Sequence, residues 1–213
     1  LQASGQSTAV PAGRPFADIT PVEFERFRLG LEDFLEVETS EDGLGPAFNG
    51  TSCAVCHSIP AVGGSGLMSE VRAGIRSPSG EFRPVLNADG TEGDTLFQVF
   101  SIPGHACQPV PPPEVNVVAR RIPIPLFGSG LVDAIPDSTI ASRADPHDLN
   151  FDGISGRAAL VSDLVTGQLR VGRFGWKAQH ATLRVFAGDA YRNEMGITNE
   201  VFPQELAQGI SAA

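Results

Sequence analysis

The chain has 213 residues and a formal net charge of -10, and 41% of its residues are hydrophobic, which is enough for a packed core. So acidic a chain is a poor partner for nucleic acid, and we expect no nucleic-acid binding. The 24 glycines and 17 prolines disfavour long helices and large sheets, and no apolar run approaches the roughly 20 residues of a membrane-spanning helix.

The predicted elements are short. Residues 1–15 are predicted to form an extended tail, followed by one domain over residues 16–213. A helix is predicted to start with a capping box at Thr20 and Glu23, with Pro21 at its first position, and its apolar side runs from Phe24 to Leu35.

Beyond residue 60, turn residues separate the predicted elements. The pattern predicts a loop at 61–66, a hairpin at 71–84, a helix or strand at 94–100, a loop at 102–114, an extended segment from 120, and helices at 129–135, 136–143 and 178–192. We therefore predict a mainly α fold of short helices with long Pro/Gly-rich loops.

The most specific motif is Cys53-Ala54-Val55-Cys56-His57, a C-x-x-C-H sequence. This spacing is typical of covalent haem attachment, because one helical turn holds both thiols at one porphyrin edge and the histidine follows as the proximal iron ligand. A zinc ribbon needs a second cysteine pair, which a chain with three cysteines lacks. A reduced dithiol with an incidental histidine is the alternative. With this motif, the predicted fold is a cytochrome c-like haem domain of short helices with long Pro/Gly-rich loops.

Covalent haem implies a place outside the cytoplasm, either the periplasm or the cell exterior. The sequence starts at Leu1, so either a signal peptide has been removed or the chain is a piece of a longer protein. The third cysteine, Cys107, then has no partner in the chain, and it is either buried as a small apolar residue or paired elsewhere.

Several strings resemble one known family. They are GLGPAFN at 43–49, CAVCH at 53–57, RIPIPLFGSGL at 121–131, AIPD at 134–137, DGISGR at 152–157, GRFGWKA at 172–178 and NEMGIT at 193–198. Together they are similar to the bacterial di-haem oxidoreductases, also described as peroxidases or thiol oxidoreductases, and distantly to the di-haem cytochrome c peroxidases. The resemblance implies the N-terminal haem half of such a protein.

The resemblance also implies electron transfer in a peroxidase-like oxidoreductase, with one haem c in this chain. A redox partner protein, or a second haem-bearing half or chain, would complete the di-haem unit. The alternative function is a non-catalytic mono-haem electron-transfer or structural subunit of a larger extracytoplasmic complex. We favour the enzyme.

The sixth iron position has several candidate ligands. We prefer Met195, which lies in a family-like string just after a predicted helix, and its thioether would favour electron transfer. The alternatives are His105 and His180, then Met68 and His147. An open position is the remaining option, and a peroxidase would need one.

Three further groups are candidates for binding or relay. Residues 148–154 begin like a calcium-binding loop, and the candidate ligands are Asp148, Asn150, Asp152 and Ile154. Ala159 stands where an EF-hand has its bidentate acid. An ordinary polar turn is the alternative. Trp176 either relays electrons or packs against a porphyrin edge or in the core. Arg120 and Arg121 are candidates for binding haem propionates, and otherwise for solvent-exposed ion pairs.

Overall fold

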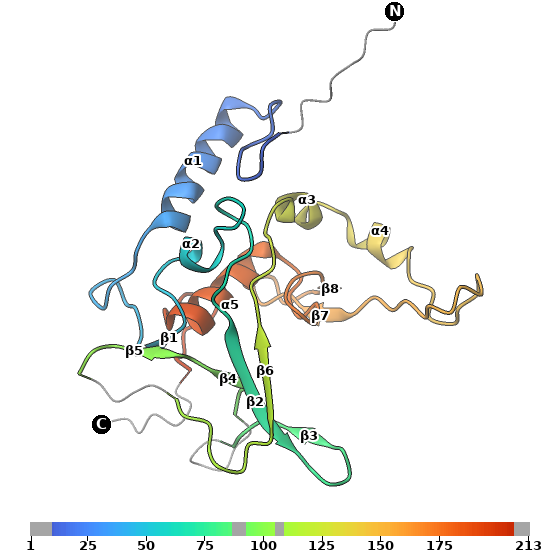
Figure 1. The fold of residues 1–213 in the computed structure, drawn as a ribbon. Coiled ribbons are helices and arrows are strands. Elements are labelled where there is room, and N and C mark those ends of the chain that lie inside the picture. Colours follow the sequence, from blue (N-terminus) through green and yellow to red (C-terminus); the bar gives the residue numbers. More distant parts are fainter. Residues whose placement is uncertain (1–9, 87–92, 105–108, 207–213) are drawn as a thin grey trace, which may run out of the picture.

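The computed structural model of the chain describes residues 10–86, 93–104 and 109–206. The candidate residues His105 and Cys107, and residues 1–9 of the predicted tail, lie outside these ranges. The helices in the described part are α1 (Pro21–Leu35), α2 (Cys53–Cys56), α3 (Ser129–Asp133), α4 (Asp137–Ala141) and α5 (Leu183–Met195). None of them is long and apolar enough to cross a membrane. Figure 1 shows α1 above α2 on the left of the molecule, α5 in the centre, and α3 and α4 to the right.

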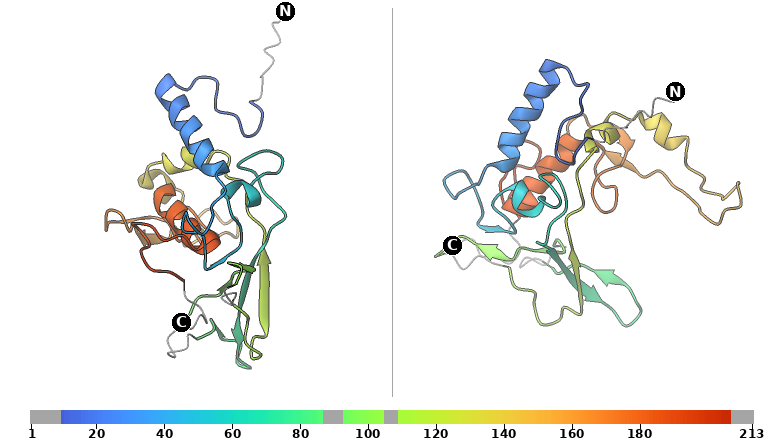
Figure 2. Two further views of the ribbon diagram at one scale, coloured as in Figure 1. Left: turned by 90° about the vertical axis from the view of Figure 1, so that its left-hand side faces the viewer. Right: turned by 45° about the horizontal axis from the view of Figure 1, so that its top comes forward.

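The largest sheet is built around β2 (Glu70–Arg76). One edge of β2 pairs antiparallel with β6 (Val117–Arg121), and the other edge pairs with β4 (Leu96–Phe97) and β3 (Phe82–Arg83). Two small antiparallel ladders join β1 (Ala47–Phe48) to β5 (Phe100–Ser101) and β7 (Leu160–Ser162) to β8 (Leu169–Val171). The β2–β6 ribbon projects away from the helices (Figures 1 and 2).

The prediction of a mainly α fold is wrong, because 22% of the structure is helical and 18% is strand, in several antiparallel sheets. The missed element is β6, which pairs over its whole length with residues 70–74 of β2. Its β-branched residues Val117 and Val118 favour a strand, but the partner lies more than 40 residues earlier in the chain. Local periodicity carries no information about a pairing at that separation.

The other predicted elements agree better with the structure. The capping box at the start of α1 is confirmed, since the Glu23 amide donates to Thr20 Oγ1 (3.3 Å) and the Thr20 amide donates to Glu23 Oε2 (2.7 Å). The hairpin predicted at 71–84 is confirmed by the β2–β3 pairing. The last helix begins later than predicted, at the N-cap Thr182, and ends at Gly196, which has a positive φ of 71°.

The core is small and excludes α1. Its apolar members come mainly from β1, β2, β4, β8 and α5: Leu44, Ala47, Ala73, Leu96, Phe97, Val171, Phe174, Ala181, Val185 and Met195. No residue of the amphipathic helix α1 is buried. The apolar side of α1 is only partly covered, since Phe27, Leu31 and Phe34 are half-buried and Phe24 and Leu35 are exposed.

Candidate haem-binding site

The C-x-x-C motif forms a single helical turn, as predicted. Cys53 and Cys56 are the first and last residues of α2, and both are free thiols. Buried Ser52 is the N-cap, and its Oγ accepts a hydrogen bond from the Val55 amide (3.2 Å). Residues three apart lie on one side of a helix, so both thiols are presented together.

The two thiols are poorly suited to dithiol exchange. Burial raises the pKa of Cys53, and it raises the pKa of Cys56 to about 11 with a contribution from the charge of Glu194. Exchange and zinc binding both use the thiolate, which these environments disfavour. Moreover, within the described residues no three His, Cys, Asp or Glu side chains gather to hold a metal ion.

The orientation of His57 leaves one ring nitrogen available. Its Nδ1–H donates to the Gly64 carbonyl oxygen at 2.9 Å, and because a carbonyl only accepts, Nδ1 carries the proton. In the neutral ring Nε2 then has a free lone pair, and it makes no hydrogen bond to any described residue. A metal-bound histidine usually has its other nitrogen anchored in this way.

A tight loop over residues 57–66 creates this anchor. The Ser58 and Ile59 amides donate to the Ser65 carbonyl at 2.9 and 2.8 Å, and the Gly63 amide donates to the His57 carbonyl at 2.9 Å. A Cβ at Gly64 would lie 2.1 Å from Ile59 O, and one at Gly66 would lie 2.0 Å from Cys56 O. These two glycines therefore allow a close backbone approach that a side chain would prevent.

An apolar cleft of about 780 Å³ lies beside this loop. One side of the cleft is α1, and the other side is formed by residues 10–15, Ala17, Ala61 and Val62. The α1 residues are Phe24, Phe27, Arg28, Leu31 and Leu35. The ring of Phe34, also on α1, lies 6.3 Å from the His57 ring. The cleft has the size of a typical cofactor site, so these residues fit a covalently attached porphyrin.

The string at 121–131 also contacts the His57 loop. Ser65 Oγ donates to the Pro123 carbonyl (2.7 Å), and the Leu126 amide donates to the Gly63 carbonyl (2.7 Å). The segment after β6 thus holds the His57 loop in place through these two hydrogen bonds. This explains how two strings far apart in the chain contribute to one site.

The C-terminal end of α5 is bonded to the segment that leads into α2. The Gly45 amide donates to the Met195 carbonyl (2.8 Å) and the Asn49 amide to the Glu194 carbonyl (2.7 Å). Asn49 Nδ2 also donates to Glu194 Oε2 (2.7 Å). Met195 itself is only 4% exposed. The end of α5, which carries the preferred sixth ligand, therefore lies against the segment that leads into the attachment motif.

Glu194 is the most perturbed acid near the motif. Burial raises its pKa to about 7, with a further upward contribution from Glu70, against the lowering effects of the Asn49 hydrogen bond and of Arg72. The carboxyl thus stands next to the haem-attachment turn in a form that changes charge near neutral pH. Sequence reasoning missed both Glu194 and Asn49, and their only signal was membership of the family-like strings.

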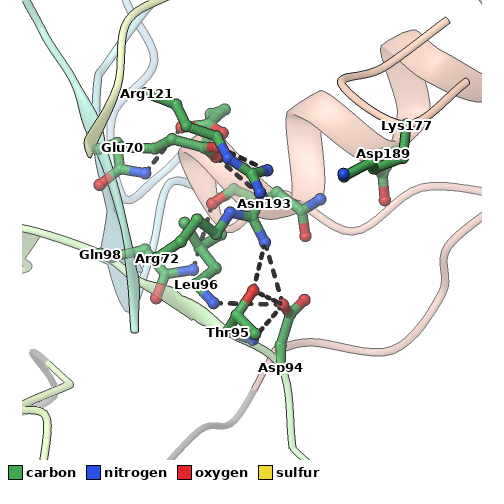
Figure 3. Close-up of polar contacts among 12 residues, drawn as sticks. Glu70, Arg72, Asp94, Thr95, Leu96, Gln98, Arg121, Lys177, Asp189 and Asn193 are labelled. Atoms are coloured by element: carbon green, nitrogen blue, oxygen red, sulfur yellow. Dashed lines mark hydrogen bonds and ion pairs between the residues drawn. The ribbon is translucent and has the colours of Figure 1, made fainter. Parts of the chain in front are cut away.

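A polar network joins the same end of α5 to the sheet (Figure 3). Arg72 donates to Glu70 (2.8 Å) and to Asp94 (3.0 Å), and Gln98 Nε2 donates to the Asn193 carbonyl (3.2 Å). The Gln98–Asn193 contact joins α5 to the residue that follows β4, and Arg72 joins β2 to the segment before β4. The site is therefore held by the sheet that sequence reasoning did not foresee.

The family comparison concerns the second half of the chain. Residues 113–212 match the family model described as "Di-haem oxidoreductase, putative peroxidase". This region is therefore similar to the di-haem oxidoreductases. The match confirms the predicted family and implies a haem cofactor and oxidoreductase chemistry. Neither the curated proteins nor the solved structures include a match.

The matched region corrects one expectation. We expected the resemblance to mark an N-terminal haem half that includes the C-x-x-C-H motif, but the match covers the C-terminal part of this chain and begins after His57. It includes α3, α4, α5 and the string at 121–131 that contacts the His57 loop. The di-haem family also suggests a second haem-bearing part.

The three candidates for relay and propionate binding lie on and beside β6. Trp176 is 55% exposed, so it is not a core aromatic, and the Arg121 guanidinium lies 5.4 Å from its ring centroid. Arg121 also pairs with Glu70 at 3.6 Å. Arg120 is exposed on β6. Arg121 therefore already has Glu70 and Trp176 as partners.

The histidine alternatives for the sixth position are placed differently. His180 Nε2 lies 3.0 Å from Asp189 Oδ2, and its ring packs near Phe186 and Phe202. His147 is exposed in the segment after α4, and Met68 is half-buried. In this arrangement the iron-binding nitrogen of His180 is already hydrogen-bonded.

The predicted calcium loop has its carboxylates turned toward backbone amides. Asp148 Oδ1 accepts from the Asp152 and Gly153 amides (3.0 and 3.2 Å), and Asp152 Oδ1 accepts from the Ile154 amide (2.8 Å). Asn150 Oδ1 accepts from the Asp152 amide (3.1 Å). These bonds are those of a polar turn, and a cation would have to compete with them for the same oxygens.

Proposed function

We propose that this chain is a c-type haem domain that carries one haem, bound covalently through Cys53 and Cys56. The observation that carries the proposal is the combination of two free thiols on one helical turn and a His57 whose Nδ1–H is fixed by Gly64. Each thiol adds across one vinyl group, with its hydrogen going to the vinyl carbon, so attachment needs no oxidant. When bound, haem supplies one-electron chemistry at its iron.

In this proposal the protein's residues each have a defined role. His57 offers Nε2 as the proximal ligand, and the Gly64 carbonyl keeps its ring in one tautomer and orientation. The apolar residues of α1 and of the 61–62 segment exclude water from the porphyrin faces. Met195 is proposed as the sixth ligand, since the end of α5 is bonded to the segment before α2.

The function that these residues support best is electron transfer within a di-haem peroxidase-like oxidoreductase. The family description names two haems, and the sequence has one C-x-x-C-H motif, so the second haem would belong to a further part of the protein or to another chain. A stable Met195 ligand would favour the alternative, a non-catalytic electron carrier, because a peroxidase needs an exchangeable iron position.

Two further proposals accompany this function. Covalent haem attachment supports a periplasmic, extracellular or cell-surface location. The D-x-N-x-D-G pattern at 148–153 supports calcium binding in a reorganised loop, with Ile154 contributing its carbonyl oxygen.

The three cysteines provide the test. The protein is produced with a cytochrome c maturation system, denatured, and assayed for haem that stays on the polypeptide. We expect retention in the wild type and in Cys107→Ser, which serves as the matched control. Cys53→Ser/Cys56→Ser should retain none. Equal retention in the double variant and the control would disprove attachment at this motif.

A further inference from the structure

The cleft beside α1 has a second wall that comes from the residues before this helix. Residues 10–15 and Ala17 line it, and Figure 1 shows this segment folding back beside α1, above α2. The Arg14 amide donates to the Pro11 carbonyl at 3.2 Å, and Gly13 has a positive φ of 78°. This is a tight turn whose third residue favours glycine. The turn fixes the position of Arg14 in the wall.

The turn packs against the loop that follows His57. A Cβ at Gly13 would lie 3.0 Å from Ala61 Cβ and 3.1 Å from the Val62 carbonyl oxygen, so the two backbones are in close contact. Ala61 and Val62 line the same cleft. The segment that carries Arg14 is therefore packed against residues that follow the proposed proximal ligand.

The cleft is apolar except for two arginines. Among the described residues that line it, the charged side chains are those of Arg14 and Arg28. The Arg28 guanidinium is neutralised within α1, since it pairs with Glu25 at 2.7 Å and with Glu32. Arg14 is exposed and forms no ion pair with any described residue. It therefore leaves one positive charge beside the cleft with no counterion among these residues.

The proposed haem carries the negative charge that this cleft lacks. A haem has an apolar ring with two propionate carboxylates at one edge, so an apolar cleft can hold the ring only if the carboxylates reach water or a cation. An exposed arginine in the wall of the cleft meets this need, because its donors bind a carboxylate in pairs. The net charge of -10 makes the rest of the chain a poor partner for these carboxylates.

The two arginines that the sequence suggested for this role do not line the cleft. Arg121 pairs with Glu70 at 3.6 Å and lies over the Trp176 ring. Arg120 is exposed on β6. Position and unpaired charge therefore favour Arg14 over both.

We propose that Arg14 binds a propionate of the haem, and that residues 10–17 form a strap that holds its guanidinium beside the cleft. The inference rests on the proposed haem function and adds a binding residue that the C-x-x-C-H motif does not indicate. The contact is a charge-assisted, bidentate ion pair. A cation beside the haem also favours the reduced iron, which carries one positive charge fewer, so Arg14 raises the midpoint potential.

The test compares holoproteins by resonance Raman spectroscopy of the haem propionates and by the midpoint potential. Arg14→Gln removes the charge and the bidentate donor, whereas Arg14→Lys keeps the charge and loses only the bidentate geometry. We expect Arg14→Gln to shift the propionate bending band toward that of a free carboxylate and to lower the midpoint potential. Arg14→Lys should shift the band and keep most of the potential.

The matched control is Arg26→Gln, which removes one positive charge from an exposed residue of α1 that is not among those lining the cleft. It should leave the band unchanged and the potential nearly unchanged. Equal shifts in Arg14→Gln and Arg26→Gln, or no shift in Arg14→Gln, would overturn the assignment. Two thioethers hold the haem without Arg14, so a lower haem content in Arg14→Gln than in the control would also contradict it.

Haem that stays on the denatured polypeptide separates this inference from the function on which it rests. A wild type without such haem would refute the proposed function itself. A wild type that keeps its haem, with a propionate band that does not respond to Arg14→Gln, would refute only the role of Arg14.

Discussion

Replacing Gly66 with alanine should destabilise the loop that orients His57. The new Cβ would lie 2.0 Å from the carbonyl oxygen of Cys56, whereas ordinary contacts begin at 3.4 Å. The backbone of the loop or of α2 must then move by about 1.4 Å, which is the difference between these distances. Because the neighbour is backbone, no side-chain rotation can relieve the overlap.

The expected cost follows from this overlap. Overpacking of this kind destabilises proteins by typically 1–3 kcal/mol, and we expect about 2 kcal/mol for Gly66→Ala, because the neighbour is backbone. That loss corresponds to a fall of about 30-fold in the ratio of folded to unfolded protein. Movement of the loop also moves the Gly64 carbonyl, so the variant should bind haem with a less uniform His57 orientation.

Denaturant unfolding measures the first effect, and the absorption spectrum and haem content per chain measure the second. Gly30→Ala is the matched control, since nothing lies within 4 Å of a Cβ at this helical position, and it should stabilise α1 by about 0.5–1 kcal/mol. If Gly66→Ala unfolds at the same denaturant concentration as the wild type and keeps its spectrum, the account of the His57 loop is incorrect.

Three other predictions concern acidic groups and the sixth ligand. Burial raises the pKa of the Glu194 carboxyl to about 7 from its ordinary 4.5. Its contribution to stability is therefore present below about pH 4.5 and is lost as the pH rises through 7. Glu194→Gln should flatten the fall in melting temperature between pH 4 and pH 8, and an unchanged pH profile would count against the assignment. Met195→Ala should abolish the near-infrared sulfur-to-iron band of the oxidised holoprotein, whereas His180→Ala should keep it; a wild type without that band does not use Met195. A calcium chelator should lower the melting temperature, and Asp148→Asn/Asp152→Asn should be insensitive to it, whereas no shift over a wide calcium range would leave residues 148–154 an ordinary turn.

The sequence predicted the local features of the site well. Cys53, Cys56 and His57 are informative because covalent haem chemistry needs them at fixed spacing, and the cap at Ser52 forms within the same turn. The capping box of α1 and the role of Gly64 and Gly66 are likewise short-range effects. Each of these depends on residues no more than about ten positions apart.

The parts that sequence reasoning missed depend on long-range contacts. The β2–β6 pairing joins residues 70–74 to 117–121, and Asn49 meets Glu194 across 145 positions. Nothing in the neighbourhood of Glu194 indicates that its carboxyl is buried, and a Glu near a helix end is normally exposed. The mainly α prediction failed for the same reason, since strands of two to seven residues are stabilised by distant partners.

The most direct test of a covalently bound haem is the intact mass of the acid-denatured, solvent-extracted protein. For the wild type we expect the mass of the polypeptide plus one haem. For Cys53→Ser/Cys56→Ser we expect the mass of the polypeptide alone. A wild-type mass without haem, from a protein that was produced with haem-attachment machinery, would contradict the account.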